Sequence, residues 1–135
     1  GGDLAFGYRR SFLTDRPDAV VLRAVFRLAP GDPDEIRQQM RELTERRRAS
    51  QPLDLPSAGS TFKRPEGYFA GTLIDQCGLK GLTVGGAQVS EKHAGFIVNR
   101  GGATSADVRE LIRQVQARVL DATGVRLEPE VRIID

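Results

Sequence analysis

Residues 103–124 read ATSADVRELIRQVQARVLDATG, and they decide the fold class because they describe one complete amphipathic helix with both ends marked. Thr104 or Ser105 is the expected N-cap, since a hydroxyl there accepts hydrogen bonds from the unpaired amides of the first turn. Gly124 ends the pattern, as glycine commonly does after a helix. The apolar residues recur at helical spacing and predict a buried stripe, made of Val108, Leu111, Ile112, Val115 and Val119.

Two further helices are expected upstream. In 31–48, GDPDEIRQQMRELTERRR, Asp32 is the predicted N-cap, Pro33 the first helical residue, and Glu35 closes a capping box. The apolar face of that helix consists of Ile36, Met40 and Leu43. In 66–81, EGYFAGTLIDQCGLKG, the apolar spacing is again helical and Gly78 ends it. Cys77 lies on that apolar face, which favours a core position over a nucleophile.

The remaining periodic segments are short and favour strands. Residues 18–28, DAVVLRAVFRL, are rich in β-branched and aromatic residues and predict a strand. Residues 82–99 contain the runs LTV and FIV between glycine turns, and predict two or three strands. The tail from 125 alternates around Pro129, as an edge or interrupted strand does. Strand, helix, loop, helix, strands, helix and strand is an α+β order.

Composition is that of an ordinary soluble globular chain, with 135 residues, 39% hydrophobic and 28% charged. No apolar run approaches a membrane span and no leader is recognisable, so we expect a cytoplasmic protein without a membrane partner. The single cysteine and the single histidine, His93, exclude an internal disulfide and a conventional zinc site. A structural or hydrogen-bonding role is therefore expected for His93.

Charge is concentrated in the middle of the chain. The net charge is only +2, yet all lysines and most glycines fall within 57–102, where acidic residues are few. Cations beside flexible backbone indicate a site for an anionic small molecule. No dinucleotide, phosphate-loop or zinc-protease motif specifies the chemistry. A noncatalytic nucleotide- or RNA-binding module therefore stays open as an alternative.

Two cationic stretches each allow two interpretations. The stretch 57–65, SAGSTFKRP, has neither helical nor strand periodicity, so it is expected to be a loop, either a plain turn or a place where backbone approaches an anion. The run Arg46, Arg47 and Arg48 ends the predicted helix 32–48, where it either complements the helix dipole in solvent or clamps an anion.

Several segments together resemble one family. The sequences are GYRRSF (7–12), TERRR (44–48), PSAGSTFKRP (56–65), YFAGTLIDQCGLKG (68–81), VGGAQVSEKHAGFIVN (84–99) and LEPEVRII (127–134). In this order they resemble the carboxy-terminal part of UDP-N-acetylenolpyruvoylglucosamine reductase (MurB), in its shorter subtype. The resemblance implies an α+β substrate domain of mixed or antiparallel strands packed by about three helices.

The resemblance also implies a reaction and its residues. In that family, NADPH reduces FAD, and the flavin passes hydride to the enolpyruvyl group of a UDP-sugar, giving UDP-N-acetylmuramate for peptidoglycan synthesis. Ser60 would be the proton donor, because the enolate-like intermediate is basic enough to take a hydroxyl proton. Arg9 and Glu130 would stabilise the charge on the enolpyruvyl carboxylate. Glu128 competes with Glu130 for this role; by itself, Glu130 would be interpreted as a surface carboxylate paired with Arg132.

Substrate-binding residues follow from the same resemblance. Arg47 or Arg48 would bind the pyrophosphate, and the spacing does not distinguish them. Lys63 would lie near Ser60, and Arg64 stands where much of the family has asparagine. Arg132 completes the expected set. Gln88, Lys92 and His93 are candidates without an assigned role.

The resemblance finally implies a division of the chain. Residues 1–31 would be strands that end the second flavin-binding domain, 32–124 the substrate domain, and 125–135 a strand returning toward the flavin-binding domains. The expected partners are a UDP-sugar and an amino-terminal flavin-binding half that this chain lacks, with no nucleic acid. We therefore expect this chain alone to bind no FAD and to be inactive.

Overall fold

The computed structural model describes residues 4–7, 10–16 and 18–134. The chain separates into two compact units, residues 1–35 and 36–135, which are described one at a time. Within the described ranges, no helix is both long and apolar enough to cross a membrane.

The second unit is built on a four-stranded sheet. Its strands are β1 (Ser57–Ser60), β2 (Thr83–Val84), β3 (Ala87–Val89) and β4 (Phe96–Asn99). They lie in the order β1-β4-β3-β2, and every neighbouring pair is antiparallel. The α+β class is confirmed, and so are the strands predicted within 82–99.

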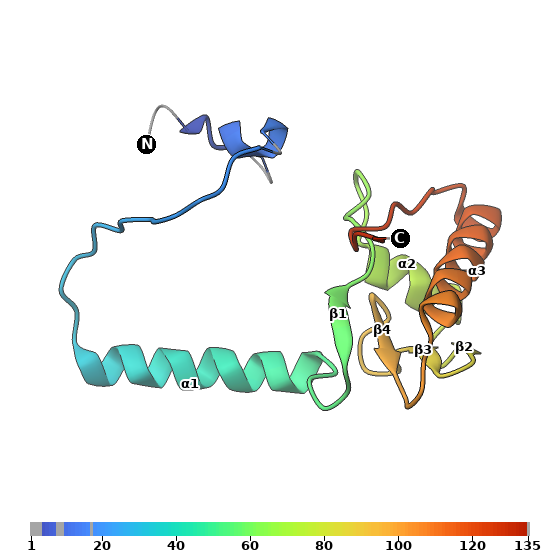
Figure 1. Ribbon diagram of the computed structural model, residues 1–135. Helices are drawn as coiled ribbons and strands as arrows, with labels where there is room; N and C mark the ends of the chain where they lie inside the picture. Colours follow the sequence, from blue (N-terminus) through green and yellow to red (C-terminus); the bar gives the residue numbers. More distant parts are fainter. Residues whose placement is uncertain (1–3, 8–9, 17, 135) are drawn as a thin grey trace. The chain divides into compact units, whose positions relative to one another are not determined.

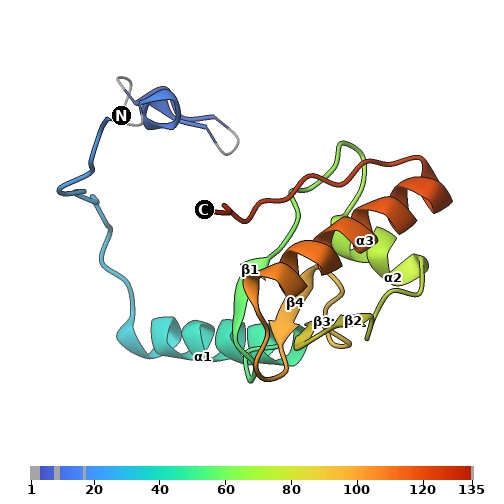
Figure 2. The same ribbon diagram turned by 45° about the vertical axis from the view of Figure 1, so that its right-hand side comes forward.

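Two helices pack on this sheet (Figures 1 and 2). They are α2 (Ala70–Gln76) and α3 (Ser105–Thr123), and α3 contacts β2, β3 and α2. Thr104 and Asp107 form a capping box at the start of α3, in which the Asp107 amide donates to Thr104 Oγ1 at 3.1 Å. Gly124 ends α3 with a φ of 72°, so both predicted ends of this helix are confirmed.

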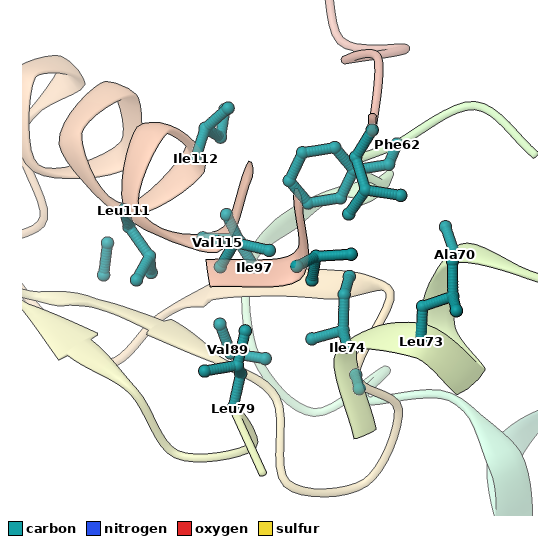
Figure 3. Close-up of a cluster of buried hydrophobic side chains, with 14 residues drawn as sticks. Phe62, Ala70, Leu73, Ile74, Leu79, Val89, Ile97, Leu111, Ile112 and Val115 are labelled. Atoms are coloured by element: carbon teal, nitrogen blue, oxygen red, sulfur yellow. The ribbon is translucent and has the colours of Figure 1, made fainter. Parts of the chain in front are cut away.

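The core lies between the two helices and the sheet (Figure 3). Ile74 of α2 and Leu111 of α3 are fully buried there. Cys77 packs against this cluster, as expected from its apolar face. The other buried apolar residues of the cluster are Phe62, Ala70, Leu73, Leu79, Ala87, Val89, Ala94, Ile97, Ile112, Val115, Val119 and Leu127.

The glycine turn between β2 and β3 lies against the loop before α3. A methyl group at Gly86 would collide with the backbone nitrogen of Ala103 and the carbonyl oxygen of Gly101. One at Gly85 would meet the carboxylate of Asp107. The absence of side chains at 85 and 86 therefore lets the hairpin reach the start of α3.

Helix α1 (Pro33–Ser50) confirms the helix predicted from residue 32. Asp32 Oδ1 accepts hydrogen bonds from the amides of Asp34 at 2.8 Å and Glu35 at 3.0 Å, as an N-cap does. None of the residues of α1 is buried. Its predicted apolar face, Ile36, Met40 and Leu43, is exposed in the described chain.

The strand predicted over 18–28 is wrong for this structure. The described residues there are irregular, and Leu22 and Phe26 are 94% and 80% exposed. Strand-forming residues become a strand only when a neighbouring strand accepts and donates their hydrogen bonds. Among its described residues, the first unit forms a 3-10 helix, η2 (Phe12–Asp15), and an isolated bridge between Gly7 and Arg10.

The loop predicted at 57–65 is also wrong in part. Residues 57–60 form β1 at the edge of the sheet, beside β4. Small polar residues have little intrinsic strand preference, so the pairing with β4 decides the conformation. The segment after β1 then pairs on its other side with the tail, through a bridge between Phe62 and Pro129. The tail makes this bridge without being a regular strand, which agrees with the interrupted strand expected around Pro129.

Candidate functional site

The site is built around the end of β1, where the strand carries a bulge. Ser57 pairs with Val98 and Ser60 pairs with Phe96, so the register shifts between the two pairs. Gly59 lies inside the shift with a φ of +86°, a conformation that favours glycine. Bulges turn side chains out of the regular alternation of a strand. Ser60 follows directly and is exposed, and its hydroxyl donates to the Phe62 carbonyl at 3.3 Å.

The tail brings Glu130 to the same place. The Glu130 amide donates to the Thr61 carbonyl at 2.8 Å, and the Lys63 amide donates to the Glu128 carbonyl at 2.8 Å. These bonds flank the bridge between Phe62 and Pro129, so the two segments run antiparallel. Glu130 is therefore bonded to the residue that follows Ser60, although α2, the strands β2 to β4 and α3 separate them in sequence.

The two glutamates of the tail have different surroundings. Glu128 accepts a hydrogen bond from Lys63 Nζ at 3.1 Å, and both side chains are largely exposed. Lys63 thus forms a surface ion pair next to β1. Glu128 thus has a cationic partner on the surface of the chain.

A groove of about 590 Å³ lies beside the paired segments. Ser57 and Thr61 line it from the β1 side, and Arg132 lines it from the tail. Its other lining residues are mostly apolar and come from β4, the start of α3 and the tail. Arg132 therefore lies at the same groove as residues 57 and 61 of the bulged segment.

A second cavity, of about 490 Å³, lies at the carboxyl end of α1. Arg48, Lys92 and Arg100 give it three cationic lining residues, and Gln88 and Ser90 add polar groups. Lys92 Nζ donates a short hydrogen bond to the Arg48 carbonyl, which joins α1 to the turn between β3 and β4. Asp54 and Glu91 also line the cavity, so its three cations outnumber its two carboxylates and favour an anionic group over a cationic one.

The arginines at the end of α1 are not equivalent. Arg46 pairs with Glu42 at 4.0 Å, and Arg47 Nε donates to Gln51 Oε1 at 3.1 Å. Arg48 alone of the three lines the 490 Å³ cavity. The geometry thus separates Arg48 from Arg47, which the sequence spacing does not.

Arg64 contacts two neighbouring residues of the chain, Tyr68 and Phe69. Its Nε donates to the Tyr68 carbonyl at 3.3 Å, and its guanidinium lies 4.0 Å from the centre of the Phe69 ring. This stacked arrangement holds the side chain at the start of α2. Arg9 lies outside the described residues.

His93 makes structural contacts, as predicted. Its Nδ1 accepts a hydrogen bond from the Gly95 amide at 3.1 Å, and its ring meets Phe96 edge-on at 4.9 Å. Side chains at Gly71 or Gly95 would press against the ring.

Thr61 is a residue of this region that the sequence analysis did not single out. It is buried, with 3% of its surface exposed, and its burial depends on partners that are distant in the chain.

The fold and site define an α+β domain with a bulged, serine-bearing edge strand and a cation-lined cavity. The family described as UDP-N-acetylenolpyruvoylglucosamine reductase, C-terminal domain, matches residues 51–134. The chain belongs to the UDP-N-acetylenolpyruvoylglucosamine reductase (MurB) family.

Individual relatives agree. The reductases of Pediococcus pentosaceus and Limosilactobacillus reuteri are 58% and 59% identical to this chain over 132 residues. The crystal structure of MurB from Thermus caldophilus superposes with a TM-score of 0.79 at 41% identity, covering 97% of this chain and 46% of that one. Each of these two matches spans 98% of this chain but only 44% of the reductase, so the chain corresponds to less than half of either relative. The RNA-binding alternative finds no support in these comparisons.

The amino-termini of α1 and α3 and the glycine turn at 85–86 are not suited to the pyrophosphate of FAD. Helix amino-termini and glycine turns bind pyrophosphate through free amides. Asp32 takes the first amides of α1, and Thr104 and Asp107 take those of α3. The glycine turn at 85–86 is filled by Asp107 and the loop before α3. Each of these places already carries a carboxylate, which repels a second anion.

Proposed function

We propose that this chain forms the substrate-binding part of an enzyme that reduces the enolpyruvyl group of UDP-N-acetylenolpyruvoylglucosamine. The observation that carries the proposal is the hydrogen bond from the Glu130 amide to the Thr61 carbonyl, which holds the glutamate-bearing tail beside the strand of Ser60. The names of the relatives support the reaction, and the 98% coverage of this chain supports the residue assignments.

Ser60 is proposed to deliver the proton. Its hydroxyl makes a long hydrogen bond, at 3.3 Å, to the Phe62 carbonyl, and the side chain is exposed, so the hydroxyl can turn toward a bound substrate. Once hydride has reached one alkene carbon, the other carbon has enolate character. An enolate is a strong enough base to take a proton from a positioned hydroxyl.

Glu130 and Arg9 are proposed to act on the substrate carboxylate. Negative charge develops there as the enolate forms, and a cation or a protonated carboxyl group aimed at it stabilises the transition state. Glu130 is preferred to Glu128 because it directly precedes Val131 and Arg132, where the resemblance places the family's glutamate.

Arg48 and Lys92 are proposed to bind the pyrophosphate of the UDP group. Both line the 490 Å³ cavity, and Lys92 is hydrogen-bonded to the Arg48 carbonyl. Phosphate oxygens form strong charge-assisted hydrogen bonds with such groups. Arg47, with its Nε on Gln51, is the weaker candidate.

FAD and NADPH are proposed for the whole protein, in which FAD supplies the hydride. The amino-termini of α1 and α3 already carry carboxylates, and the relatives are more than twice as long as the matched segment. We therefore assign FAD binding, for the most part, to an amino-terminal half that this chain does not contain.

The test measures substrate-dependent NADPH oxidation by the full-length protein that carries this chain. For Ser60→Ala we expect turnover to fall by about 10²- to 10⁴-fold, the usual contribution of a positioned acid, with little change in KM for the UDP-sugar. Ser50→Ala, which removes a hydroxyl at the end of α1, should leave turnover unchanged. Undiminished turnover in Ser60→Ala would refute the assignment of the proton donor.

A matched pair of glutamate variants tests the observation that carries the proposal. Glu130→Gln should lower turnover strongly. Glu128→Gln should lose only its surface ion pair with Lys63, and its turnover should stay at the wild-type value. The opposite pattern would transfer the catalytic role to Glu128. If both variants kept the turnover of the wild-type enzyme, neither glutamate of the tail would take part in the reaction.

A further inference from the structure

Thr61 is a buried polar residue at the centre of the site. Its exposed fraction is 3%, whereas its neighbour Ser60 is exposed. A buried hydroxyl costs free energy unless it is hydrogen-bonded, so the partners of the Thr61 side chain are the first question.

Three hydrogen bonds connect Thr61 to two other segments. Its amide donates to the Gly95 carbonyl at 2.8 Å, and its Oγ1 accepts from the Ile97 amide at 3.2 Å. Its carbonyl accepts from the Glu130 amide at 2.8 Å. The residue therefore ties the strand end to β4 on one side and to the tail on the other.

The hydroxyl acts where the sheet is irregular. Ser57 pairs with Val98 and Ser60 with Phe96, so the register changes opposite Ile97. Thr61 Oγ1 offers the Ile97 amide a side-chain acceptor at this point. A bulged strand is held less firmly by its ladder, and this bond fixes the backbone that follows the bulge.

We propose that Thr61 is a positioning residue for proton delivery. Its hydroxyl locks the chain after the bulge, and its carbonyl locks the tail, so that Ser60 and Glu130 keep one mutual arrangement. The proposal rests on the proposed reductase function and assigns to that reaction a residue that acts through Ser60 and Glu130.

The experiment compares Thr61→Val, which keeps the shape and loses the acceptor, with Thr61→Ser, which keeps the hydroxyl. In the full-length protein we expect turnover of Thr61→Val to fall by about 10²-fold, the effect of misplacing a reacting group by about 1 Å, with KM nearly unchanged. The solvent deuterium isotope effect on turnover should rise, because proton transfer becomes slower than the other steps. Thr61→Ser should restore both values.

Thr72→Val is the matched control, since Thr72 is exposed on α2. A merely structural role would lower the melting temperature of Thr61→Val and leave turnover and the isotope effect of the folded enzyme unchanged, and that result would overturn the proposal. Should Thr61→Val not fold, Thr61→Cys tests the same point with a weak sulfur acceptor: a raised isotope effect supports the proposal and an unchanged one overturns it.

The wild-type protein separates this proposal from the one on which it rests. A wild-type enzyme without substrate-dependent NADPH oxidation refutes the reductase function, and the role of Thr61 with it. An active wild-type enzyme with a Thr61→Val variant of equal turnover and isotope effect refutes only the role of Thr61.

Discussion

Gly86 shows how a single residue determines the contact between the hairpin and α3. A Cβ atom at this position would overlap the backbone of Gly101 and Ala103, and backbone atoms yield less easily than the end of a flexible side chain. The β2–β3 turn could accommodate a methyl group only by moving away from the loop that starts α3.

We therefore predict that Gly86→Ala lowers the free energy of unfolding by roughly 2 kcal/mol, as overpacking typically does. Urea unfolding followed by circular dichroism measures it. Gly7→Ala is the control, because among the described residues its methyl group would come near Arg10 Cβ alone, at an ordinary contact distance of 3.9 Å. Equal stability of the two variants would show that the turn has room to move.

Thr61 illustrates the limit of sequence prediction at this scale. The family resemblance pointed to Ser60, whereas the residues of 57–65 by themselves left a plain turn or an anion-binding loop open. The bond from Ile97 to Thr61 spans 36 residues, and no local pattern contains it. The same holds for the ion pair of Lys63 with Glu128, 65 residues away.

At the scale of elements, the amino-terminus of α3 depends on one carboxylate. The Thr104 amide donates to Asp107 Oδ2 at 2.8 Å. This backbone hydrogen bond, followed by that of the Thr104 hydroxyl, lowers the pKa of Asp107 below its ordinary value. A carboxyl group whose pKa is lowered by folding stabilises the protein above its unfolded pKa and loses that effect as pH falls through the folded pKa.

We predict that the wild-type chain is more stable than Asp107→Asn at pH 7, and that the difference shrinks as the pH falls below the ordinary aspartate range of about 4. Urea unfolding at a series of pH values measures it. At the other end of α3, Asp121→Asn is the control, since a carboxylate there faces the negative end of the helix dipole and its removal should not destabilise the chain. A difference for Asp107→Asn that persists at the lowest pH would contradict the role of the charge.

The elements predicted well are those whose signals are local. Asp32 with Pro33 started α1, and Thr104 with Gly124 bounded α3, because caps act within one helical turn. Strands need partners, so residues 18–28 were wrongly predicted as a strand and Ser57–Ser60 was missed as one.

At the scale of the whole molecule, apolar side chains of the first unit are exposed. Over 20–28 these are Val20, Val21, Leu22, Val25, Phe26 and Leu28. Clustered exposed apolar residues mark surfaces that bind a partner or drive aggregation. Under the function proposed above, the amino-terminal half would be the partner that covers these residues, since this chain matches only 44% of its relatives' length.

We predict that this chain, produced alone, self-associates through 20–28, and that the double variant Leu22→Ser, Phe26→Ser reduces the association. Sedimentation velocity over a range of concentrations measures it. Leu120→Ser, at a less exposed leucine of α3, is the control and should sediment like the unaltered chain. Equal sedimentation of the double variant and the unaltered chain would exclude 20–28 as the contact.

The pairing of residues 61–63 with the tail has a consequence for biosynthesis. Ribosomes release a chain from its amino-terminus onward, so β1 leaves the exit tunnel well before residues 128–130 are even translated. Because the tunnel covers the most recently joined residues, α3 and the tail emerge last, and residues 61–63 pair with 128–130 only near the end of synthesis. Under the function proposed above, a message that stops ahead of Glu128 would yield a product that lacks Glu130 and does not turn over substrate.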